Sequence, residues 1–420
     1  MPKINSGDTA WLLASAALVM FMTPGLAFFY GGLVRAKNVL GTIMQSFVAL
    51  GLVTVIWVGI GYTLAFGPDK GGVIGGLKFA GLSGVGGTPN GFAPTVPATA
   101  YMVFQLMFAI ITPALIAGAF AERMKFSGYL LFIALWSILV YAPIAHWQWG
   151  GGFLGAHVHS IDFAGGAVVH ANAGAAALAT AIYLGRRRGH GPSAFAPHNV
   201  PFVLLGAGIL WFGWFGFNAG SAFGAGTVAS SAFVDTQIGA AAAMLAWLAC
   251  ERVRTGKATA IGAATGAVAG LATITPASGY VEPGGALVIG VAAGFLCYLA
   301  LGVKDRLGYD DSLDVVGVHM VGGVLGVVLT GAFASLAINA AGAAASLAQV
   351  GRQTVLALVT VGYSFAVTML ILKVSDLLVG LRVTEEHETA GLDLSQHGEL
   401  AYRWTEVIEV TVDPPDAGQP

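Results

Sequence analysis

Long apolar stretches alternate with short polar loops along nearly the whole chain. Each stretch is close to the about 20 residues that an α-helix needs to cross a bilayer. Because lipid offers no partners for backbone amides, each stretch is expected to be a helix. The pattern predicts an all-α integral membrane protein with eleven transmembrane helices, at residues 9–33, 40–66, 98–121, 127–147, 163–184, 199–219, 228–253, 257–274, 283–302, 313–336 and 350–381.

Composition agrees with this membrane assignment. The chain of 420 residues is 56% hydrophobic and 10% charged, with a mean hydropathy of +0.78, whereas soluble domains are about 25% charged. Its 61 glycines suit helices that pack closely in lipid. A net charge of −2 without a long basic run gives no reason to expect nucleic acid as a partner. Cys250 and Cys297 lie in apolar stretches, as small buried side chains do, and show no metal or disulfide spacing.

The basic residues of the loops predict the orientation. Cytoplasmic loops of membrane proteins carry an excess of Lys and Arg. The loops after the odd-numbered stretches are rich in them, and the other side carries only Lys3, Lys70, Lys78 and Arg352. We therefore expect the N-terminus outside, residues 1–382 as the transmembrane domain and residues 383–420 as a cytoplasmic tail, in a multi-pass protein of the cell (plasma or inner) membrane. The basic residues of the inner loops are Arg35, Lys37, Arg123, Lys125, Arg186, Arg187, Arg188, Arg252, Arg254, Lys257, Lys304 and Arg306.

Two stretches carry a histidine in similar surroundings, which suggests an internal repeat. His170 stands in GAVVHANAG and His319 in VVGVHMVGG. Five stretches per copy would make the two copies inverted, followed by a final long helix. Inverted repeats place a substrate path at their interface near the middle of the membrane.

His170 and His319 lie in the middle of predicted helices, where the chain has almost no other ionisable group. A polar group at that depth is costly unless it faces a cavity or a partner. A histidine that ties two helices together is one interpretation. Two histidines at matching positions favour the other, a pair that lines a pore, where neutral imidazoles donate and accept hydrogen bonds and can pass a proton.

Two aspartates stand before these helices. Asp162 precedes FAGG at the expected outer start of its helix, where a carboxylate can accept N-terminal amides. Capping is the favoured interpretation and direct cation coordination the sharper alternative. Asp314, before His319, is expected to play a similar capping part.

Aromatic residues with polar neighbours gather at three helix ends. Trp149 lies in AHWQWGGG, Phe108 in the segment FQLMF, and Phe217 and Ser221 in WFGFNAGS. An aromatic cage with a hydroxyl suits a small monovalent cation, because each ring can contribute about 0.5–2 kcal/mol of cation–π attraction. Taken alone, a belt of interfacial aromatics explains these residues better.

The chain resembles an ammonium transporter of the Amt/Mep/Rh superfamily, on the Amt side. The similarity runs from about residue 20 to 402 and is carried by several segments together. These are 28–38 (FFYGGLVRAKN), 145–152 (AHWQWGGG), 162–174 (DFAGGAVVHANAG), 213–221 (GWFGFNAGS), 275–280 (TPASGY), 314–319 (DVVGVH) and the tail segment 391–402 (GLDLSQHGELAY).

The resemblance implies an assembly and a set of roles. It implies a homotrimer with one pore per subunit, and no enzymatic activity or cofactor. It implies an outer recruitment site for ammonium at Phe108, Trp149 and Ser221, supported by Asp162 from below. It also implies a stacked gate of Phe108 and Phe217, and a pore with a hydrogen-bonded pair of histidines. The pore residues are His170, His319 and Trp214.

Ammonium and potassium have similar charge and size, so charge alone cannot separate them. Ammonium has directed N–H donors that a hydroxyl or an imidazole can bind. A bare ion in an apolar pore is expensive, and desolvation favours the neutral form. We therefore expect ammonium to lose its proton at or below the gate and ammonia to pass the histidine pair, with the proton crossing by a separate or shared route.

Three other functions compete with this one. The first is a membrane redox protein with haem held by His170 and His319. The second is an ammonium sensor that uses the pore for detection and the tail for signalling, and the third is a Rh-type channel for carbon dioxide. The presence of both Trp149 and Ser221 favours capture of a cation over the carbon dioxide channel.

The tail departs from the family pattern. Residues 403–420 form an acidic extension, which bears on whether a PII-type signal protein binds at the cytoplasmic mouth as the resemblance implies. Ser395 supplies a hydroxyl in the tail and is a candidate for phosphorylation.

Overall fold

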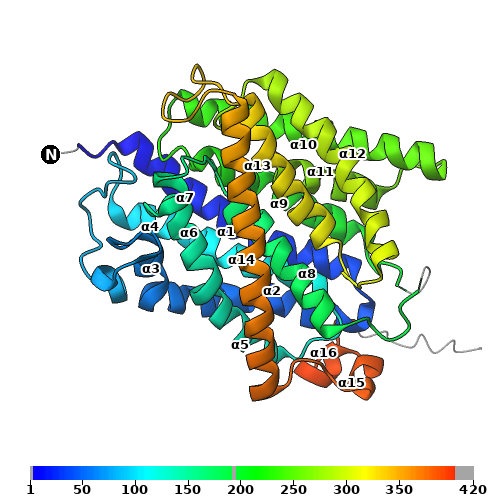
Figure 1. Ribbon diagram of the computed structural model, residues 1–420. Coiled ribbons are helices and arrows are strands. Elements are labelled where there is room, and N and C mark those ends of the chain that lie inside the picture. The colour runs from blue at the N-terminus through cyan, green and yellow to red at the C-terminus, as the bar shows by residue number, and fades with distance from the viewer. Residues whose placement is uncertain (1–2, 192–194, 403–420) are drawn as a thin grey trace, which may run out of the picture.

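A computed structural model describes residues 3–191 and 195–402, and this part of the chain is almost entirely helical (Figure 1). The long helices pack as one bundle, and short π-helical turns interrupt two of the described helices and begin two others. The predicted acidic extension, residues 403–420, lies outside the described residues. The helices of the first half are α1 (Ser6–Leu33), α2 (Val39–Ile56) with η2 (Trp57–Gly61) and α3 (Tyr62–Phe66), α4 (Ala98–Ile116) with η4 (Ala117–Phe120), α5 (Phe126–Trp136) with η5 (Ser137–Tyr141) and α6 (Ala142–Trp149), α7 (Phe153–Ala156), and η6 (Gly166–Ala171) with α8 (Asn172–Leu184).

The second half repeats the alternation of long helices and short loops. Its helices are α9 (Val200–Gly220), α10 (Thr227–Thr255), α11 (Ala260–Ile274), α12 (Pro283–Leu307), η7 (Val316–Val321) with α13 (Gly322–Phe333), and α14 (Leu347–Val379), followed by α15 (Glu385–Ala390) and α16 (Leu392–His397). A small hairpin of β1 (Asp69–Lys70) and β2 (Ile74–Gly75) and two 3-10 turns, η1 (Ala36–Asn38) and η3 (Leu77–Leu82), lie between helices of the first half.

Each predicted stretch coincides with a helix. Ten of the described helices are long and apolar enough to cross a membrane, and α11, with 15 residues, is shorter. The chain is thus a multi-pass helical protein, whereas the count of eleven spans, the inverted repeat and the orientation stay predictions. Large apolar side chains face outward, such as Leu245 (63% exposed) and Leu358 (68% exposed). Such a surface is unfavourable in water and suits lipid.

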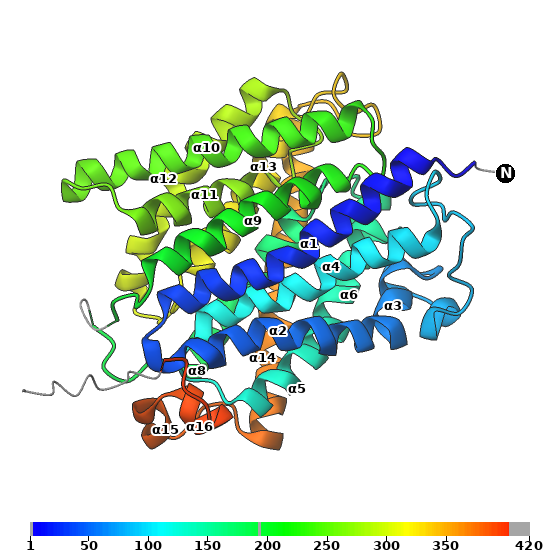
Figure 2. The same cartoon turned by 180° about the vertical axis from the view of Figure 1, so that it is seen from behind.

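Glycines set the closest approach between helices. The helices α1 and α9 run side by side over much of their length (Figure 2). A Cβ atom on Gly206 would lie 2.2 Å from the backbone nitrogen of Phe29, and one on Gly213 would lie 2.7 Å from the carbonyl oxygen of Leu18. Larger residues at these positions would push the helices apart, which explains the high glycine content in packing terms.

The tail packs against the end of the bundle that we call inner, following the predicted orientation. Helix α16 lies there beside the start of α2, and α15 packs against α16 (Figure 1). Asp393 accepts a hydrogen bond from the Gly41 amide at 2.8 Å, and the Leu392 amide donates to Asn38 at 2.8 Å. A carboxylate at a helix N-terminus satisfies amides that have no partner within the helix. The tail therefore holds the first turn of α2.

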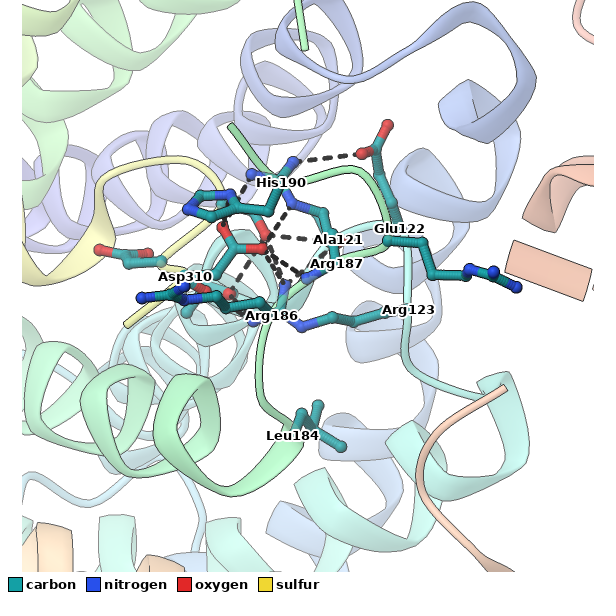
Figure 3. A network of polar contacts seen from close by, with 12 residues as sticks. Ala121, Glu122, Arg123, Leu184, Arg186, Arg187, His190 and Asp310 are labelled. Atoms are coloured by element: carbon teal, nitrogen blue, oxygen red, sulfur yellow. Dashed lines mark hydrogen bonds and ion pairs between the residues drawn. The ribbon is translucent and has the colours of Figure 1, made fainter. Parts of the chain in front are cut away.

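A buried ionic network joins the loops at the inner end (Figure 3). Asp310 accepts hydrogen bonds from the backbone amide, Nε and Nη2 of Arg187 at 2.8 to 2.9 Å. The Nη1 group of Arg187 donates to Glu122 at 3.1 Å, and Glu122 in turn accepts from Arg35 and Asn38. Loops that follow α1, α4, α8 and α12 are thereby linked through three buried charged groups.

The network also fixes the charge of its carboxylates. Burial alone would raise the pKa of Asp310, but the hydrogen bonds and charge of Arg187, and then the charge of Arg123, lower it to about 2. For Glu122, burial is likewise outweighed by Arg35 and Arg187, which lower its pKa. Because the folded pKa of Asp310 lies below the unfolded value of about 3.9, its contribution to stability is present above that value. It is lost only as the pH falls through about 2.

Replacing Asp310 with alanine would leave the buried guanidinium group of Arg187 with Glu122 as its only carboxylate partner and would remove the nearby charge from Arg123. We expect the Asp310→Ala variant to lose about 3–5 kcal/mol of stability, equally at pH 7 and pH 5, measured as thermal unfolding in detergent micelles. Glu386→Ala removes an exposed carboxylate of the tail and serves as the control. Equal melting temperatures for Asp310→Ala and the parent would contradict this role.

Candidate functional site

An open cavity of about 770 Å³ lies at the outer end of the bundle. It brings together residues from α4, the end of α6, the segment before η6 and the end of α9. Four of the residues expected at the recruitment site, Phe108, Trp149, Asp162 and Ser221, are among those that line it. Residues from four segments that are distant in the sequence, which we expected to lie together, thus line one cavity. Tyr101 and Phe223, which the sequence analysis did not single out, also line it.

Trp149 forms one wall of this outer cavity. It is the last residue of α6, and its indole N–H donates to the carbonyl oxygen of Asp162 at 2.9 Å. That bond fixes the ring, which stands at 87° to the ring of Phe108 with centroids 6.1 Å apart. The Ser221 hydroxyl donates to the Phe217 carbonyl at 2.8 Å, so its oxygen keeps lone pairs that can accept a donor from the cavity.

Asp162 caps the helix that carries His170. Its two carboxylate oxygens accept hydrogen bonds from the amides of Gly165, Gly166, Ala167 and Val168 at 2.7 to 3.1 Å. The favoured interpretation from the sequence, capping, is what the geometry shows. With four amide donors on two oxygens, the carboxylate acts on a cation through its charge and through the loop that it holds.

Phe108 and Phe217 close the bottom of the outer cavity. Their ring centroids are 4.3 Å apart and the ring planes are inclined by 41°, so the pair is tilted rather than stacked face to face. Both rings are buried, with 1% and 0% exposed. The expected pair is therefore in contact, although its geometry differs from the stack that the resemblance implied.

A narrow passage lies beneath this pair, with a free volume of about 10 Å³. That is about the volume available to a single water-sized molecule. Its lining is apolar apart from the histidines and the Trp214 indole, whose N–H is occupied by Thr275 at 2.9 Å. The lining residues are Met22, Leu26, Phe29, Ile111, Leu115, His170, Leu210, Trp214, Phe217, Val268 and His319.

His170 and His319 lie next to each other in the passage. Their ring centroids are 5.3 Å apart and the planes differ by 17°, and Trp214 stacks on His170 at 5.3 Å. Both nitrogens of His170 and Nδ1 of His319 are buried and have no hydrogen-bond partner among the described residues. The expected hydrogen bond within the pair is therefore not formed in this structure.

A second cavity, of about 190 Å³, opens from His319 toward the inner end. His319, Phe29 and Val268 line both this inner cavity and the passage. In the same way, Phe108 lines the outer cavity and contacts Phe217 of the passage. The order from the outer to the inner end is thus cavity, aromatic pair, narrow passage and cavity.

The prediction that Asp314 caps the helix of His319 is wrong. The carboxylate of Asp314 pairs with Lys304, and the Val316 amide donates instead to Asp311, at 2.7 Å. Asp311 stands eight residues before His319, as Asp162 stands eight before His170 (319 minus 311 and 170 minus 162). This spacing was present in the sequence and identifies the capping residue.

Asp314 instead occupies the position that corresponds to Gly165. Each stands five residues before its histidine and has a left-handed backbone, with φ of 62° and 113° respectively. Aspartate tolerates this conformation better than most residues with a side chain. In addition, His170 and His319 both lie in π-helical turns, η6 and η7, that lead into α8 and α13. The two segments therefore share a local design.

The geometry argues against haem between the two histidines. A porphyrin would have to enter the space around the rings, which is about 10 Å³. The rings also lie side by side at 5.3 Å and are lined by packed apolar residues. In the part of the chain that the structure describes, no group of three or more His, Cys, Asp or Glu residues is placed to hold a metal ion.

Comparisons with known proteins point in one direction. A profile of the Ammonium Transporter Family matches residues 10–402. The ammonium transporter of Mycobacterium tuberculosis (strain ATCC 25618 / H37Rv) is 50% identical over 98% of this chain and 93% of its own length. That of Bacillus subtilis (strain 168) is 47% identical over 95% of this chain and 99% of its own length.

Solved structures agree with these sequence relatives. The crystal structure of Saccharomyces cerevisiae Mep2 superimposes with a TM-score of 0.88 at 35% identity, over 96% of this chain and 93% of that one. A structure described as a sensor Amt protein gives a TM-score of 0.87 at 29% identity, over 93% of this chain and 98% of that one.

The family profile and these relatives cover almost the whole described bundle, including the outer cavity, the passage and the inner cavity. The chain therefore belongs to the Ammonium Transporter Family, and it is a multi-pass membrane protein that transports ammonium and is not an enzyme.

Proposed function

We propose that this protein captures ammonium in the outer cavity, removes its proton at or below the Phe108–Phe217 pair and conducts ammonia past His170 and His319. The observation that carries the proposal is a passage of about 10 Å³ that contains imidazole nitrogens without partners, between two cavities. Buried polar atoms are ordinarily satisfied. A small hydrogen-bonding molecule in transit would satisfy these.

The size and polarity of the passage explain why the neutral form crosses. A cation brings its hydration shell, for which about 10 Å³ leaves no room. Without that shell, a charge in an apolar passage costs far more than a neutral amine. Ammonium can escape this cost by releasing a proton, and potassium cannot. The imidazoles accept from ammonia or donate to it and can relay the proton.

Trp149, Phe108 and Ser221 are proposed to form the recruitment site. Two aromatic rings and a hydroxyl oxygen face one cavity, and the charge of Asp162 lies at its base. A desolvated cation over an aromatic face gains about 2 kcal/mol or more. These contacts favour the cation at the cavity, before its proton is lost.

The assembly and partners that we propose follow the family resemblance. We expect a homotrimer with one pore per subunit, with residues 1–382 in the membrane and the tail from residue 383 in the cytoplasm. A PII-type protein is the proposed partner at the inner end, where α15 and α16 present a polar surface.

A sensor remains the second candidate function, since a structure described as a sensor Amt protein shares the fold. The fold alone does not separate the two, because both would bind ammonium. A measurement of ammonium flux into liposomes that contain the pure protein separates a transporter from a sensor. Binding of ammonium without flux would favour the sensor.

The histidine pair gives the most direct test of conduction. We expect His170→Ala combined with His319→Ala to abolish selective ammonium uptake, because the passage loses the groups that bind ammonia and relay its proton. Uptake into liposomes in the presence of excess potassium measures this. His198→Ala, which changes a histidine outside the passage, controls for the loss of an imidazole. Full uptake by the folded double variant would remove the pair from the mechanism.

Trp149 tests capture separately from conduction. We expect Trp149→Leu to raise the half-saturating ammonium concentration about three- to thirtyfold, as loss of about 0.7–2 kcal/mol of cation–π attraction predicts. The concentration dependence of flux is the measurement. Trp211→Leu alters a tryptophan that is not among the residues lining the outer cavity or the passage. An unchanged concentration dependence in Trp149→Leu would make this residue an interfacial aromatic only.

Ser395 tests whether the tail regulates transport. It lies on α16, two residues from the carboxylate of Asp393 that holds α2, and its hydroxyl donates to Gly391 at 2.8 Å. Phosphorylation adds a charge of about −1.5 to −2, so Ser395→Asp is expected to loosen this contact and change the transport rate. Ser395→Ala controls for the lost hydroxyl. Indistinguishable rates for Ser395→Asp and the parent would argue against the switch.

A further inference from the structure

Residues 159–162, which we call the cavity segment, belong to no helix or strand, yet all four line the outer cavity. In a membrane protein, non-helical backbone is tolerated where it is buried in protein or lines a cavity, and its amides and carbonyls need partners there. For the cavity segment, most of these partners are side chains of two helices, α6 on one side and α14 on the other. The segment ends in Asp162, so its position bears on the capture site.

The contacts from α6 tie the cavity segment to the helix that carries the indole. The Nε2 group of Gln148 donates to the Ser160 carbonyl at 3.0 Å, and its Oε1 accepts from the Ser160 hydroxyl at 2.7 Å. The next residue, Trp149, donates its indole N–H to the Asp162 carbonyl at 2.9 Å. These bonds join the segment to α6 but do not hold either of them against the rest of the bundle.

The contacts from α14 centre on Gln353, whose side chain is 0% exposed. Its Oε1 accepts from the Ile161 amide at 2.8 Å, and its Nε2 donates to the Ile161 carbonyl at 2.7 Å and to the Val327 carbonyl of α13 at 3.1 Å. Oε1 also accepts from Nε2 of Gln349 at 3.4 Å. A glutamine amide has two N–H donors and two acceptor positions, so Gln353 makes every bond of which its amide is capable.

The backbone partners leave only one orientation for the Gln353 amide. The Ile161 N–H can only donate, and the carbonyls of Ile161 and Val327 can only accept. Exchanging the oxygen and nitrogen of the side chain would set donor against donor once and acceptor against acceptor twice. The direction of each bond is therefore fixed by main-chain groups.

Gln349 is the second member of this arrangement. It lies one turn before Gln353, so both side chains share a face of α14, and it is 1% exposed. Its Nε2 also donates to the His159 carbonyl at 3.2 Å, and its Oε1 accepts from Arg352 at 3.1 Å. His159 has a left-handed backbone, with φ of 58°, which is uncommon for a residue with a side chain. We call Gln349 and Gln353 the amide clamp.

The amide clamp reaches the indole through one residue. Ile161 directly precedes Asp162, whose carbonyl accepts the Trp149 indole and whose carboxylate caps η6. A displacement of Ile161 therefore moves the acceptor of the indole N–H. Helix α14 itself is braced against α13, α8 and η6, and it runs from this end of the bundle to the tail helices (Figure 1).

We infer that the amide clamp is a positioning device for ammonium capture: Gln353, supported by Gln349, fixes the backbone next to Asp162 and thereby the indole of Trp149. The inference rests on the proposed capture role of Trp149. A fully satisfied buried polar network is rigid. Without the clamp, the main-chain groups of Ile161 turn to other partners, and the indole loses its fixed acceptor. Capture is then weakened, while conduction past the histidines is retained.

Three variants separate positioning from a general effect on α14. Gln353→Leu removes all four bonds with little change of volume, and Gln349→Leu removes the bond to His159 but leaves Gln353 on Ile161. Thr368→Val is the matched control, because Thr368 is a buried residue of the same helix that accepts a hydrogen bond from Trp136 of α5, away from the cavity segment.

The measurement is ammonium flux into liposomes as a function of concentration at one pH, normalised to folded protein. For Gln353→Leu, we expect the half-saturating concentration to rise about three- to tenfold, less than for complete loss of the indole. The maximal rate should stay within about twofold, as expected when only binding is weakened. Gln349→Leu should shift the concentration in the same direction by less, and Thr368→Val should match the parent.

A parental half-saturating concentration in Gln353→Leu would overturn the inference, and so would a fall in the maximal rate alone. Should Gln353→Leu yield no folded protein, Gln349→Leu decides in the same way.

Two further readouts test the route through Asp162 and Trp149. In a double-mutant cycle, adding Gln353→Leu to Trp149→Leu should leave the half-saturating concentration of Trp149→Leu unchanged, because no indole remains to be positioned. Multiplying effects would overturn the inference. Hydrogen exchange followed by mass spectrometry should show faster exchange of the amides that Asp162 binds, residues 165–168, in Gln353→Leu than in Thr368→Val. Equal exchange in the two variants would also overturn it.

Failure of this inference can be told apart from failure of the capture site. If Trp149→Leu leaves the half-saturating concentration unchanged, the capture role itself falls, whatever the amide clamp does. If Trp149→Leu raises it and Gln353→Leu keeps the parental value, only the positioning role of the clamp falls.

Discussion

The structure depends on keeping imidazole nitrogens buried and unsatisfied in an apolar passage. Such atoms are costly, and a bundle could reduce the cost by collapsing around them or by admitting bulk water. Here Phe108 and Phe217 close the outer side, and the rings of His170 and His319 are packed beside Trp214. Rigid glycine-mediated helix contacts leave the surrounding bundle little freedom to fill the passage. Under the proposed function, the unsatisfied nitrogens are thereby kept available for ammonia.

Two carboxylates support this arrangement from opposite ends. Asp162 and Asp311 each cap the turn that leads to a histidine, so the position of each ring is set by a helix start that cannot fray easily. Left-handed backbone at Gly165 and Asp314 then directs the chain into the π-helical turn. Such turns are frequent at functional sites, since they widen the helix and redirect side chains. The two histidine segments therefore resemble each other in structure as well as in sequence: each has a capping carboxylate, a residue with left-handed backbone and a π-helical turn.

The helices and the main site residues could be predicted from the sequence because their signals are local or strongly patterned. Apolar stretches of this length predict helices directly, and residues such as His170 and Trp149 are easily recognised because they are polar or aromatic residues in or beside such stretches. Details that depend on tertiary contacts could not be read in this way. Asp314 stands closer to its histidine than Asp311 and therefore looked like the cap, but its pairing with Lys304 across the loop is visible only in the fold. The tilt of the Phe108–Phe217 pair and the unbonded Nδ1 atoms likewise depend on how separate helices meet.

The buried charged groups of the inner end, unlike the imidazoles of the passage, have partners within the protein. There buried charges are paired with one another: Arg187 binds Asp310 and Glu122, and Glu122 also binds Arg35. Paired buried charges resist rearrangement, because removing one partner leaves the other uncompensated. The same loops contact the tail, where Glu388 pairs with Arg382 and accepts from the Arg188 amide. The tail and the inner loops are therefore joined through one connected ionic network.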